Sequence, residues 1–594
     1  MRKRDRIIGL SAMGGAVASI LISFALSAVS ANAQTELPAV TAPSYDISFD
    51  LDPEARSFAG TERIRWTNND DKPTNTLYFH LYPNLRVPEP MRAPEADHLR
   101  SQVADSPDEP RLEVTDIRAG DNTTPLTFNY DETQTTMRVF LREAVPGGGS
   151  TELVLKFKGT VPLIDPDETG ILAHVVQQVD AALRNSREIR RARDINFSCR
   201  GILLLGAAYP VLAARTGDDW QRKVESSIGD TIFADTADYR VVVNAPLELS
   251  VYTSGEEAIG AANHPRVFVG HNLRSFALIA GANFKFEERQ VGGLTIRSVY
   301  LPEQEKIGHR VLNIASAAAA IYVRRFGPLP SKQLRLVQMP LVAGIGCLEF
   351  TNLGAVASAF YVDFDSPQIR NLPEMIREQR TSVEDSLEWM VAHAVAQQWW
   401  GATVGNDPDR EPVLDEALSN WSALLYYEDA FGKERAAAAQ DDQLRGVYKV
   451  YRTFGGEDMP ANRSAHEYRN FFQYAAIVNS KGALLFTQVR NLIGEERFFA
   501  GLRKYYSDFK FQVAELNDLR GAWLNQIPEA FQRRAVERLF TRWLSAKHGD
   551  EDIAPPDAEM AASLGIPGRP PRKNDRNAFA KLGKFFWQQM TRIR

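Results

Sequence analysis

Residues 381–401 read TSVEDSLEWMVAHAVAQQWWG and predict a single helix. Ser382 and Asp385 have the spacing of a capping box at its start, and Gly401 is a natural residue to follow its end. Helical geometry then decides which side chains lie together, because residues four positions apart share one face.

Three polar residues stand out in and after this helix. His393 and Gln397 are four residues apart and therefore share a face. A second helix is predicted from Pro412 to Gly432. It carries Glu416, and eighteen residues separate Gln397 from Glu416. In a zinc peptidase, two histidines and a glutamate at these positions hold the metal, and a glutamate after the first histidine accepts a proton from the metal-bound water. Here the pattern His-Glu-x-x-His appears as His393-Ala-Val-Ala-Gln397.

This spacing resembles the membrane alanyl aminopeptidase (aminopeptidase N) family of zinc metallopeptidases, in the gluzincin clan, whose members read His-Glu-x-x-His-x18-Glu. Gly346-Cys-Leu-Glu-Phe350 falls where the family has its Gly-x-Met-Glu-Asn exopeptidase strand, and Asn479-Ser-Lys-Gly-Ala483 falls where it has Tyr-Glu-Lys-Gly. Other resembling segments are residues 77–84, 209–210, 220, 229–230, 246–255 and 489–506. The resemblance covers about residues 44–545, and the chain is identified as a divergent member with degenerate zinc-binding and catalytic motifs.

The resemblance implies an α+β multidomain fold. An N-terminal β-sandwich or saddle domain is expected to precede a thermolysin-like α/β peptidase domain. The expected segments are a signal peptide at 1–33, the β-domain at 34–255, the peptidase domain with a degenerate site at 256–548, and a linker with a basic amphipathic tail at 549–594. A length of 594 residues agrees with a chain of two to four domains.

Several segments also predict individual elements. Tyr45–Leu51 alternates apolar and polar residues, as a half-buried strand does, and Pro146–Ser150 lies between two apolar runs, which indicates a hairpin. Residues 172–195 are helix-like and rich in arginine, which predicts a surface insertion. A helix is expected from about Glu305 to Phe326, followed by a strand at Leu334–Met339.

Three positions keep the residue that the family has. His393 matches the first zinc ligand, Glu416 matches the third, and Glu349 matches the glutamate that holds the free amine of the substrate. Without a metal, a carboxylate beside His393 is expected to favour the imidazolium, and Glu416 is then a vestigial ligand. Glu349 has two interpretations. It binds the amine of an extended peptide added to the strand edge, or it belongs to a leftover ion pair.

Three other positions lose the family's residue. Gln397 replaces the second zinc ligand, and a neutral amide oxygen is a poor zinc donor compared with imidazole. The alternative, purely structural interpretation of Gln397 is a buried hydrogen bond to His393. Ala394 replaces the general base, a loss that costs about 10²–10⁴-fold in rate. Asn479 replaces the tyrosine that stabilises the tetrahedral intermediate, and losing such a donor costs roughly 10²–10³-fold. No catalytic residue is therefore intact, and no cofactor is predicted.

The cysteines and histidines offer no replacement site. Cys199 and Cys347 are too few for a disulfide framework or a thiolate zinc site, and Cys347 is expected to be a buried, inert thiol. None of the nine histidines is three or four residues from another. A histidine distant in sequence that approaches His393 in space stays open.

The ends of the chain suggest its location. Basic residues at 2–6, an apolar run at 7–29 and Ala31-Asn-Ala33 predict a signal peptide and export to the periplasm or beyond the cell, with an uncleaved anchor as the alternative. Residues 569–594 combine apolar residues at helical spacing with basic ones, so they bind a membrane surface or pack on the protein itself. The net charge of -6 gives no reason to expect a nucleic-acid partner.

These observations favour an exported, catalytically inactive pseudo-peptidase that binds or scaffolds. Its partners would be peptides, held by their N-termini, or another exported protein. The alternative is an active zinc metallo-aminopeptidase with an altered metal site that removes N-terminal residues from peptides. A third possibility is a membrane-associated partner protein recruited by its basic tail. The sequence leaves open whether the chain is an enzyme.

Overall fold

The computed structural model describes residues 42–86, 109–184, 187–217, 219–258 and 265–563. The predicted signal peptide and the basic tail after residue 563 lie outside these residues. The described residues belong to one compact unit that begins at Ala42. No helix among them is long and apolar enough to cross a membrane.

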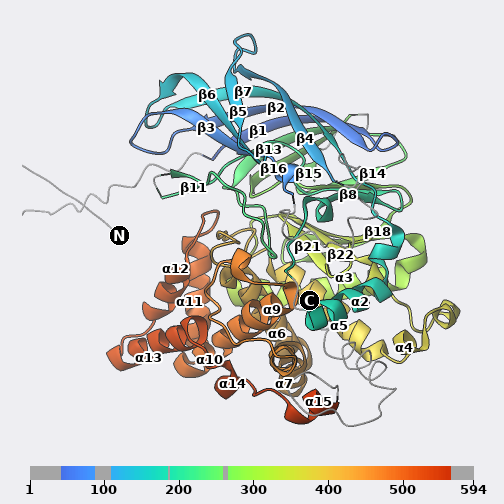
Figure 1. Cartoon of the computed structure of the whole chain (residues 1–594). Helices are drawn as coiled ribbons and strands as arrows, with labels where there is room; N and C mark the ends of the chain where they lie inside the picture. Colours follow the sequence, from blue (N-terminus) through green and yellow to red (C-terminus); the bar gives the residue numbers. More distant parts are fainter. Residues whose placement is uncertain (1–41, 87–108, 185–186, 218, 259–264, 564–594) are drawn as a thin grey trace, which may run out of the picture. The chain divides into compact units, whose positions relative to one another are not determined.

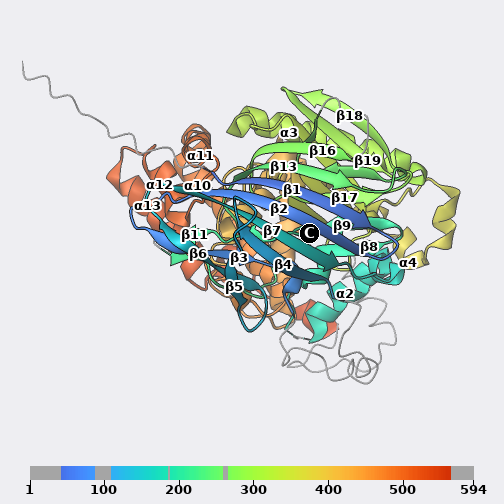
Figure 2. The same cartoon turned by 90° about the horizontal axis from the view of Figure 1, so that it is seen from above.

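Two β-sheets are built mainly from the N-terminal part of the chain (Figures 1 and 2). The larger has the strand order β15-β16-β13-β1-β2-β7-β4, and the smaller has the order β10-β3-β6-β5. The strands span β1 Ser44–Asp52, β2 Ser57–Thr67, β3 Thr74–His80, β4 Arg111–Ala119, β5 Thr127–Tyr130, β6 Thr136–Val145, β7 Ser150–Thr160, β10 Val211–Leu212, β13 Ala237–Asn244, β15 Glu256–Glu257 and β16 Arg266–Leu273. In β1 the side chains of Tyr45, Ile47, Phe49 and Leu51 are buried while those between them are more exposed, so the predicted strand is confirmed.

The prediction of a hairpin around Pro146–Ser150 is wrong. β6 and β7 flank this turn, but β6 pairs with β3 in the smaller sheet, and β7 pairs with β2 and β4 in the larger one. The backbone of Asn68 holds the turn, because its N–H donates to the carbonyl of Gly149 and its carbonyl accepts from the N–H of Gly148. The glycines signalled a chain reversal correctly, but a local turn signal does not say which sheet each strand joins.

The chain forms two further sheets, one of which includes the strand that carries Glu349. A four-stranded sheet has the order β14-β17-β9-β8, and a five-stranded sheet has the order β18-β19-β20-β22-β21. The strands span β8 Asn196–Cys199, β9 Ile202–Leu205, β14 Ser250–Thr253, β17 Leu278–Gly281, β18 Lys285–Val291, β19 Leu294–Tyr300, β20 Gln333–Met339, β21 Cys347–Phe350 and β22 Leu353–Ala357. β20 confirms the strand predicted at Leu334–Met339. β21 is the terminal strand of its sheet, pairs antiparallel with β22, and carries Glu349.

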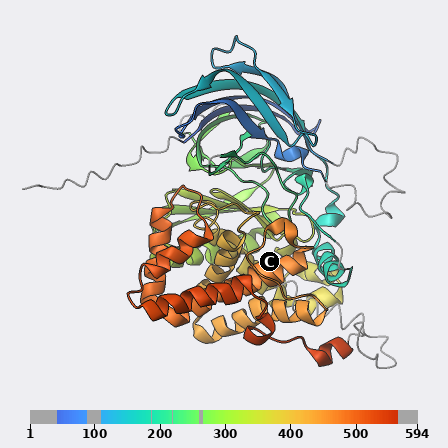
Figure 3. The same ribbon diagram turned by 60° about the vertical axis from the view of Figure 1, so that its left-hand side comes forward.

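Helices dominate after residue 370 and lie against one another, as the orange and red part of Figure 3 shows. Their bounds are α4 Glu374–Arg377, α5 Arg380–Ala396, η9 Val413–Ala417, α6 Leu418–Phe431, α7 Lys433–Gln440, η10 Asp441–Arg445, α8 Gly446–Thr453, α9 Phe471–Tyr474, η12 Ala475–Gly482, α10 Ala483–Ile493, α11 Glu495–Asp508, α12 Leu516–Leu524, α13 Ala530–Phe540, η13 Thr541–Ser545, α14 Gly549–Asp552 and α15 Ala558–Ser563. The earlier helix α3 spans Glu305–Phe326, as predicted, and ends at Gly327, whose φ of 113° suits glycine.

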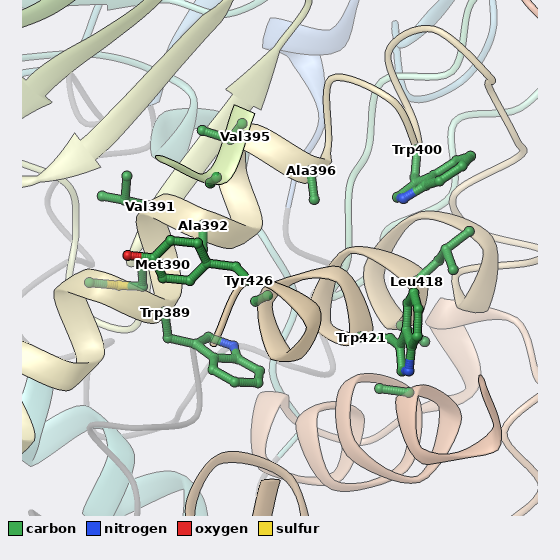
Figure 4. Close-up of a cluster of buried hydrophobic side chains, with 14 of the residues drawn as sticks. Trp389, Met390, Val391, Ala392, Val395, Ala396, Trp400, Leu418, Trp421 and Tyr426 are labelled. Atoms are coloured by element: carbon green, nitrogen blue, oxygen red, sulfur yellow. The ribbon is translucent and has the colours of Figure 1, made fainter. Parts of the chain in front are cut away.

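The start of α5 differs from the prediction. The helix begins at Arg380, and Ser382 lies inside it and is buried. The Ser382 side chain therefore does not cap the helix, while the Ser386 hydroxyl donates to the Ser382 carbonyl. Farther along the helix, Trp389 and Met390 of α5 lie in one buried apolar cluster with Leu418 and Trp421 of α6 (Figure 4). Tertiary packing has overridden the local capping signal.

The predicted insertion at 172–195 is helical in its first part, α2, which spans Ile171–Arg184. Its second part is not a surface segment throughout. The Arg193 side chain is only 6 % exposed and pairs with Glu168, and Asp194 is also buried. A high density of arginines suggested a solvent-exposed position, but here ion pairs and hydrogen bonds allow some of them to be buried.

Glu62 is an exception to the rule that buried polar groups have partners. It lies on β2 between Ile47 and Leu155, is fully buried, and has no hydrogen-bond partner for either carboxylate oxygen in the described part of the chain. The stacked rings of Tyr45 and Tyr239 lie nearby; burial raises the pKa of each, and Glu62 adds to the shift. Burial raises the pKa of Glu62 well above its ordinary value, so the folded state favours the neutral carboxyl.

Glu62→Leu is expected to raise the free energy of unfolding by about 1–3 kcal/mol, because it removes an unpartnered buried polar group. The folded pKa is raised, so the stability linked to this group is complete below the unfolded pKa of about 4.5 and is lost as the pH increases. The gain should therefore be larger at about pH 8 than at about pH 5. Calorimetric unfolding at both pH values measures this, with Glu113→Leu at an exposed position of β4 as the matched control. A gain that does not depend on pH would contradict the assignment.

Candidate functional site

The end of α5 and the start of the next helix bring together the three positions that match zinc ligands. The Nε2 atom of His393 lies 3.4 Å from Nε2 of Gln397 and 3.8 Å from Oε2 of Glu416. Two ligand atoms bound to one tetrahedral zinc ion at about 2.0–2.2 Å are roughly 3.3–3.6 Å apart. The distances from His393 to Gln397 and to Glu416 are therefore close to those between two ligands of one zinc ion.

The donor set does not fit zinc. His393 and Glu416 supply one imidazole and one carboxylate, whereas catalytic zinc sites have three such protein ligands. Gln397 supplies only a neutral amide, whose N–H₂ group lies towards His393. In the part of the chain that the structure describes, no three His, Cys, Asp or Glu side chains are gathered so that they could hold a metal ion. The residue at the general-base position, Ala394, is buried and has no acid or base function.

Burial sets the protonation state of His393. Desolvation lowers the pKa of His393 to about 4, although a hydrogen bond to Asn420 opposes this shift. The ring is therefore neutral at pH 7, and the expectation of an imidazolium beside Glu416 is wrong. Loss of hydration outweighs the attraction of a carboxylate at 3.8 Å. A neutral ring has an acceptor nitrogen, which the Gln397 amide satisfies.

Asn420 supports this arrangement from α6. Its Oδ1 accepts a hydrogen bond from the indole N–H of Trp389 at 2.8 Å, and its Nδ2 donates to the carbonyl of Glu416 at 3.1 Å. These bonds connect α5 to α6 beside His393. Asn420 is not among the residues predicted from the sequence. Its position nevertheless indicates the site, because it lies four residues after Glu416 and therefore on the same helical face.

Two buried polar groups near the site belong to the π-helical segment η12 and to Tyr474, the residue just before it. Among the described residues, neither Oδ1 of Asn479 nor the hydroxyl of Tyr474 has a hydrogen-bond partner. Burial raises the pKa of Tyr474 well above its ordinary value, and Glu416 and Asp415 contribute to the shift. A π-helix closes i→i+5 hydrogen bonds, so Tyr474 lies one turn before Asn479. The phenol of Tyr474 is therefore close to the carboxylates of Glu416 and Asp415, although Asn479 occupies the position where the family has its tyrosine.

A cavity of about 80 Å³ lies along the terminal strand β21. Leu348, Glu349 and Phe350 line it from this strand, and Gln397 and Gln398 line it from the end of α5. His393 and Glu416 are not among the described residues that line it. Gln397 therefore stands between the histidine–glutamate pair and the cavity that contains Glu349.

Gln398 fixes the strand to the helix. Its Oε1 accepts a hydrogen bond from the N–H of Asn352 at 2.8 Å, and its Nε2 donates to the carbonyl of Phe350 at 3.2 Å. The strand that carries Glu349 is thus positioned directly by the residue that follows Gln397. The sequence does not reveal this role of Gln398, because its two partners lie 46 and 48 residues away along the chain. Nearby, Cys347 is partly buried, its thiol lies 3.7 Å from the Met390 carbonyl, and both cysteines are free thiols.

Known proteins resemble parts of this chain. Residues 372–543 match the Peptidase family M1 domain. The chain is 26 % identical over 203 residues to Aminopeptidase RNPEPL1 of Mus musculus and of Homo sapiens, which covers 32 % of this chain and 27 % of those proteins. It is 25 % identical over 253 residues to the mitochondrial Aminopeptidase 2 of Saccharomyces cerevisiae, covering 40 % of this chain and 24 % of that protein. The matches therefore span about a quarter of the length of these curated relatives.

Solved structures resemble the chain over more of its length. The M1 zinc metallopeptidase of Deinococcus radiodurans is similar over 85 % of this chain and 93 % of its own, with a TM-score of 0.53 and 15 % identity. A glutamate-to-alanine mutant of that enzyme, bound to a Tyr-Ser-Ala substrate, is similar with a TM-score of 0.51 and 17 % identity. At this identity the likeness concerns the fold, and it confirms the expected α+β architecture.

Gln397→His is expected to raise the affinity for zinc by at least about 100-fold, because it adds an imidazole where two other ligands already have nearly the right spacing. Zinc titration with a competing chelator measures the change against the wild type. The control is Glu416→Gln in the Gln397→His background, which should lose the gained affinity. If Gln397→His binds zinc no better than the wild type, the two helices do not retain the spacing of a metal site.

Proposed function

This chain belongs to the aminopeptidase N-like gluzincin family, and we propose that it is an exported, catalytically inactive member that binds peptide N-termini. The observation that carries the proposal is the hydrogen-bonded pair of Gln397 and His393. A neutral imidazole bonded to an amide in a buried site is satisfied without a metal ion.

Loss of hydrolysis follows from the residues at the site. The donor set around His393 does not fit zinc, so no group there polarises a peptide carbonyl or activates water. Ala394 cannot accept a proton. Asn479 is shorter than a tyrosine, so its amide N–H₂ group does not reach as far as a phenol hydroxyl would. Each of these roles normally contributes orders of magnitude to the rate.

Peptide binding is supported by the parts of the site that remain. Glu349 lies on the terminal strand of its sheet and lines a cavity, so its carboxylate can receive a peptide ammonium group. The strand edge can pair with an extended peptide. A solved relative of the same fold, with a glutamate changed to alanine, holds a Tyr-Ser-Ala substrate. A cleft of this kind therefore binds peptide in a protein altered by such a change.

The proposal includes export and partners. The basic and apolar segments of residues 1–33 support export to the periplasm or the cell exterior. Peptides, or the N-terminus of another exported protein, are the proposed ligands. The basic residues of 569–594 provide a second means of recruitment, to an anionic membrane surface.

Wild-type protein loaded with zinc and then dialysed is expected to retain well below one equivalent and to hydrolyse none of a panel of aminoacyl reporter substrates. Metal analysis and a fluorescence assay measure both quantities. The Gln397→His variant, treated identically, shows that the loading procedure works. Near-stoichiometric zinc together with turnover in the wild type would instead establish the alternative, an active aminopeptidase with an altered metal site.

Glu349→Ala is expected to weaken the binding of a short peptide with a free N-terminus by about 10- to 100-fold, because it removes a charge-assisted hydrogen bond. Calorimetric titration of the wild type and the variant measures the difference. An N-acetylated peptide of the same sequence is the matched ligand control and should bind both proteins weakly. Equal binding of the free peptide to both proteins would refute the role of Glu349.

A further inference from the structure

Helix α2 presents an apolar face to solvent. Leu172 and Val176 are four residues apart and therefore share this face. Their side chains are 43 % and 65 % exposed, and that of Leu163, shortly before α2 in the chain, is 53 % exposed. Three of the seven exposed large hydrophobic side chains in the described ranges thus fall between residues 163 and 176. A local concentration of this kind is typical of a surface that binds a partner.

The opposite face of α2 is already covered. Ile171 and Val175 belong to the buried core. The ring of His174 packs edge-on against Phe360, and its Nδ1 accepts a hydrogen bond from the N–H of Gly344 at 3.3 Å. A helix that is apolar on two faces is normally covered on both, so the face of α2 that stays exposed calls for a further partner.

This face is separate from the cavity that contains Glu349. Arg190, near the end of the predicted insertion at 172–195, lines that cavity, but no described residue of α2 does. The backbone beside Leu163 is also held in place. The N–H of Ile164 donates to the carbonyl of Ser198, and the N–H of Ser198 donates to the carbonyl of Pro162.

Acidic side chains lie next to this face. The short helix η4 spans Pro166–Thr169 and contacts α2. Asp165, which precedes η4, and Asp167 within it are both exposed, whereas Glu168 pairs with Arg193. Opposite charges at the edge of an apolar surface favour one partner over another. The partner that fits α2 is therefore apolar on one side and basic around it.

The C-terminal end of the chain has this chemistry. Residues 569–594 contain eight basic residues and one acidic residue. Apolar residues recur among them at helical spacing, namely Phe579, Leu582, Phe586, Met590 and Ile593. A helix with this pattern has one apolar face flanked by positive charge.

The chain is long enough for this segment to reach α2. Helix α15 ends at Ser563 and contacts α8, which contacts η12; η12 contacts α9, and α9 contacts α2. Packed helices lie about 8–10 Å apart, so these four steps amount to roughly 40 Å. The fifteen residues 564–578 span up to about 50 Å when extended.

We propose that residues 579–593 dock as an amphipathic helix on the exposed face of α2 of the same chain. Their apolar side chains would cover Leu172 and Val176, and their basic side chains would lie beside Asp165 and Asp167. The inference goes beyond the proposed function, in which this tail provides recruitment to a membrane. While the tail is docked, its apolar side chains are not available to insert into a lipid bilayer.

Hydrogen–deuterium exchange of the full-length protein, read by mass spectrometry in dilute solution without lipid, tests the docking. Amides of residues 579–593 are expected to exchange at least about 10-fold more slowly than in a synthetic peptide of the same sequence, because docking stabilises the helix. The double variant Leu172→Ser/Val176→Ser should remove most of this protection. Leu247→Ser/Phe531→Ser, which changes two exposed hydrophobic residues elsewhere, is the matched control and should leave the protection unchanged.

A reciprocal variant keeps the test independent of changes in α2. Phe579→Ser/Phe586→Ser alters only the tail, and the amides of α2 should then exchange faster than in the wild type. If they exchange at the wild-type rate, the tail does not cover this helix and the inference is refuted.

The other outcomes identify a different occupant. Exchange of residues 579–593 at the rate of the synthetic peptide, or equal protection in the wild type and Leu172→Ser/Val176→Ser, overturns the inference. Protection that falls on dilution means that the tail of a second copy docks instead. Protection that appears only with vesicles containing phosphatidylglycerol also overturns docking on α2, while the proposed recruitment to an anionic membrane stands.

Discussion

The burial of α5 is the constraint on which the rest of the structure depends. This helix packs against α3, α6 and the strands β21 and β22, and most of its side chains are buried. Its polar groups must therefore find partners on its neighbours. The indole of Trp389 donates to Asn420, the hydroxyl of Tyr426 donates to Glu388, and the hydroxyl of Tyr322 donates to the Ala392 carbonyl. These bonds join α3, α5 and α6 to one another, and none of them involves a metal ion.

Burial also determines which residue is needed at position 481. In Asn479-Ser-Lys-Gly-Ala483, the lysine resembles the family and the first residue does not. Lys481 is 1 % exposed, and its ammonium group donates to Asp458 and to the carbonyls of Met459 and Ala546. Removing it would leave a buried carboxylate without its cation, which is strongly destabilising. Lys481 is therefore required by the fold, whereas Oδ1 of Asn479 has no hydrogen-bond partner among the described residues.

The sequence predicted those features that depend on local patterns. Helix α3 has its predicted bounds because its pattern ends at Gly327-Pro328, and the helices that carry His393 and Glu416 follow from the spacing of these residues. The errors concern properties that only tertiary structure determines. A turn at 146–150 does not reveal that its strands join different sheets, and the charge of His393 depends on burial that no sequence neighbour reports. Arg190 was assigned to a surface insertion because its segment is rich in arginine, although that segment reaches the cavity.

The cost of burying polar groups links the residues at positions 394 and 397 to each other. In a site without a metal, a glutamate at the position of Ala394, which is 1 % exposed, would bury a carboxylate at a large cost. A second neutral histidine at position 397 would need its own donors and acceptors, whereas glutamine bonds to His393 through its amide. Alanine and glutamine are thus residues that a metal-free version of this helix accommodates. Gln398 is subject to a different requirement, because it holds the strand of Glu349 whether or not a metal is bound. The proposed metal-free state therefore gives a physical reason for alanine at 394 and glutamine at 397 to occur together, while Gln398 supports the strand of Glu349 in either state.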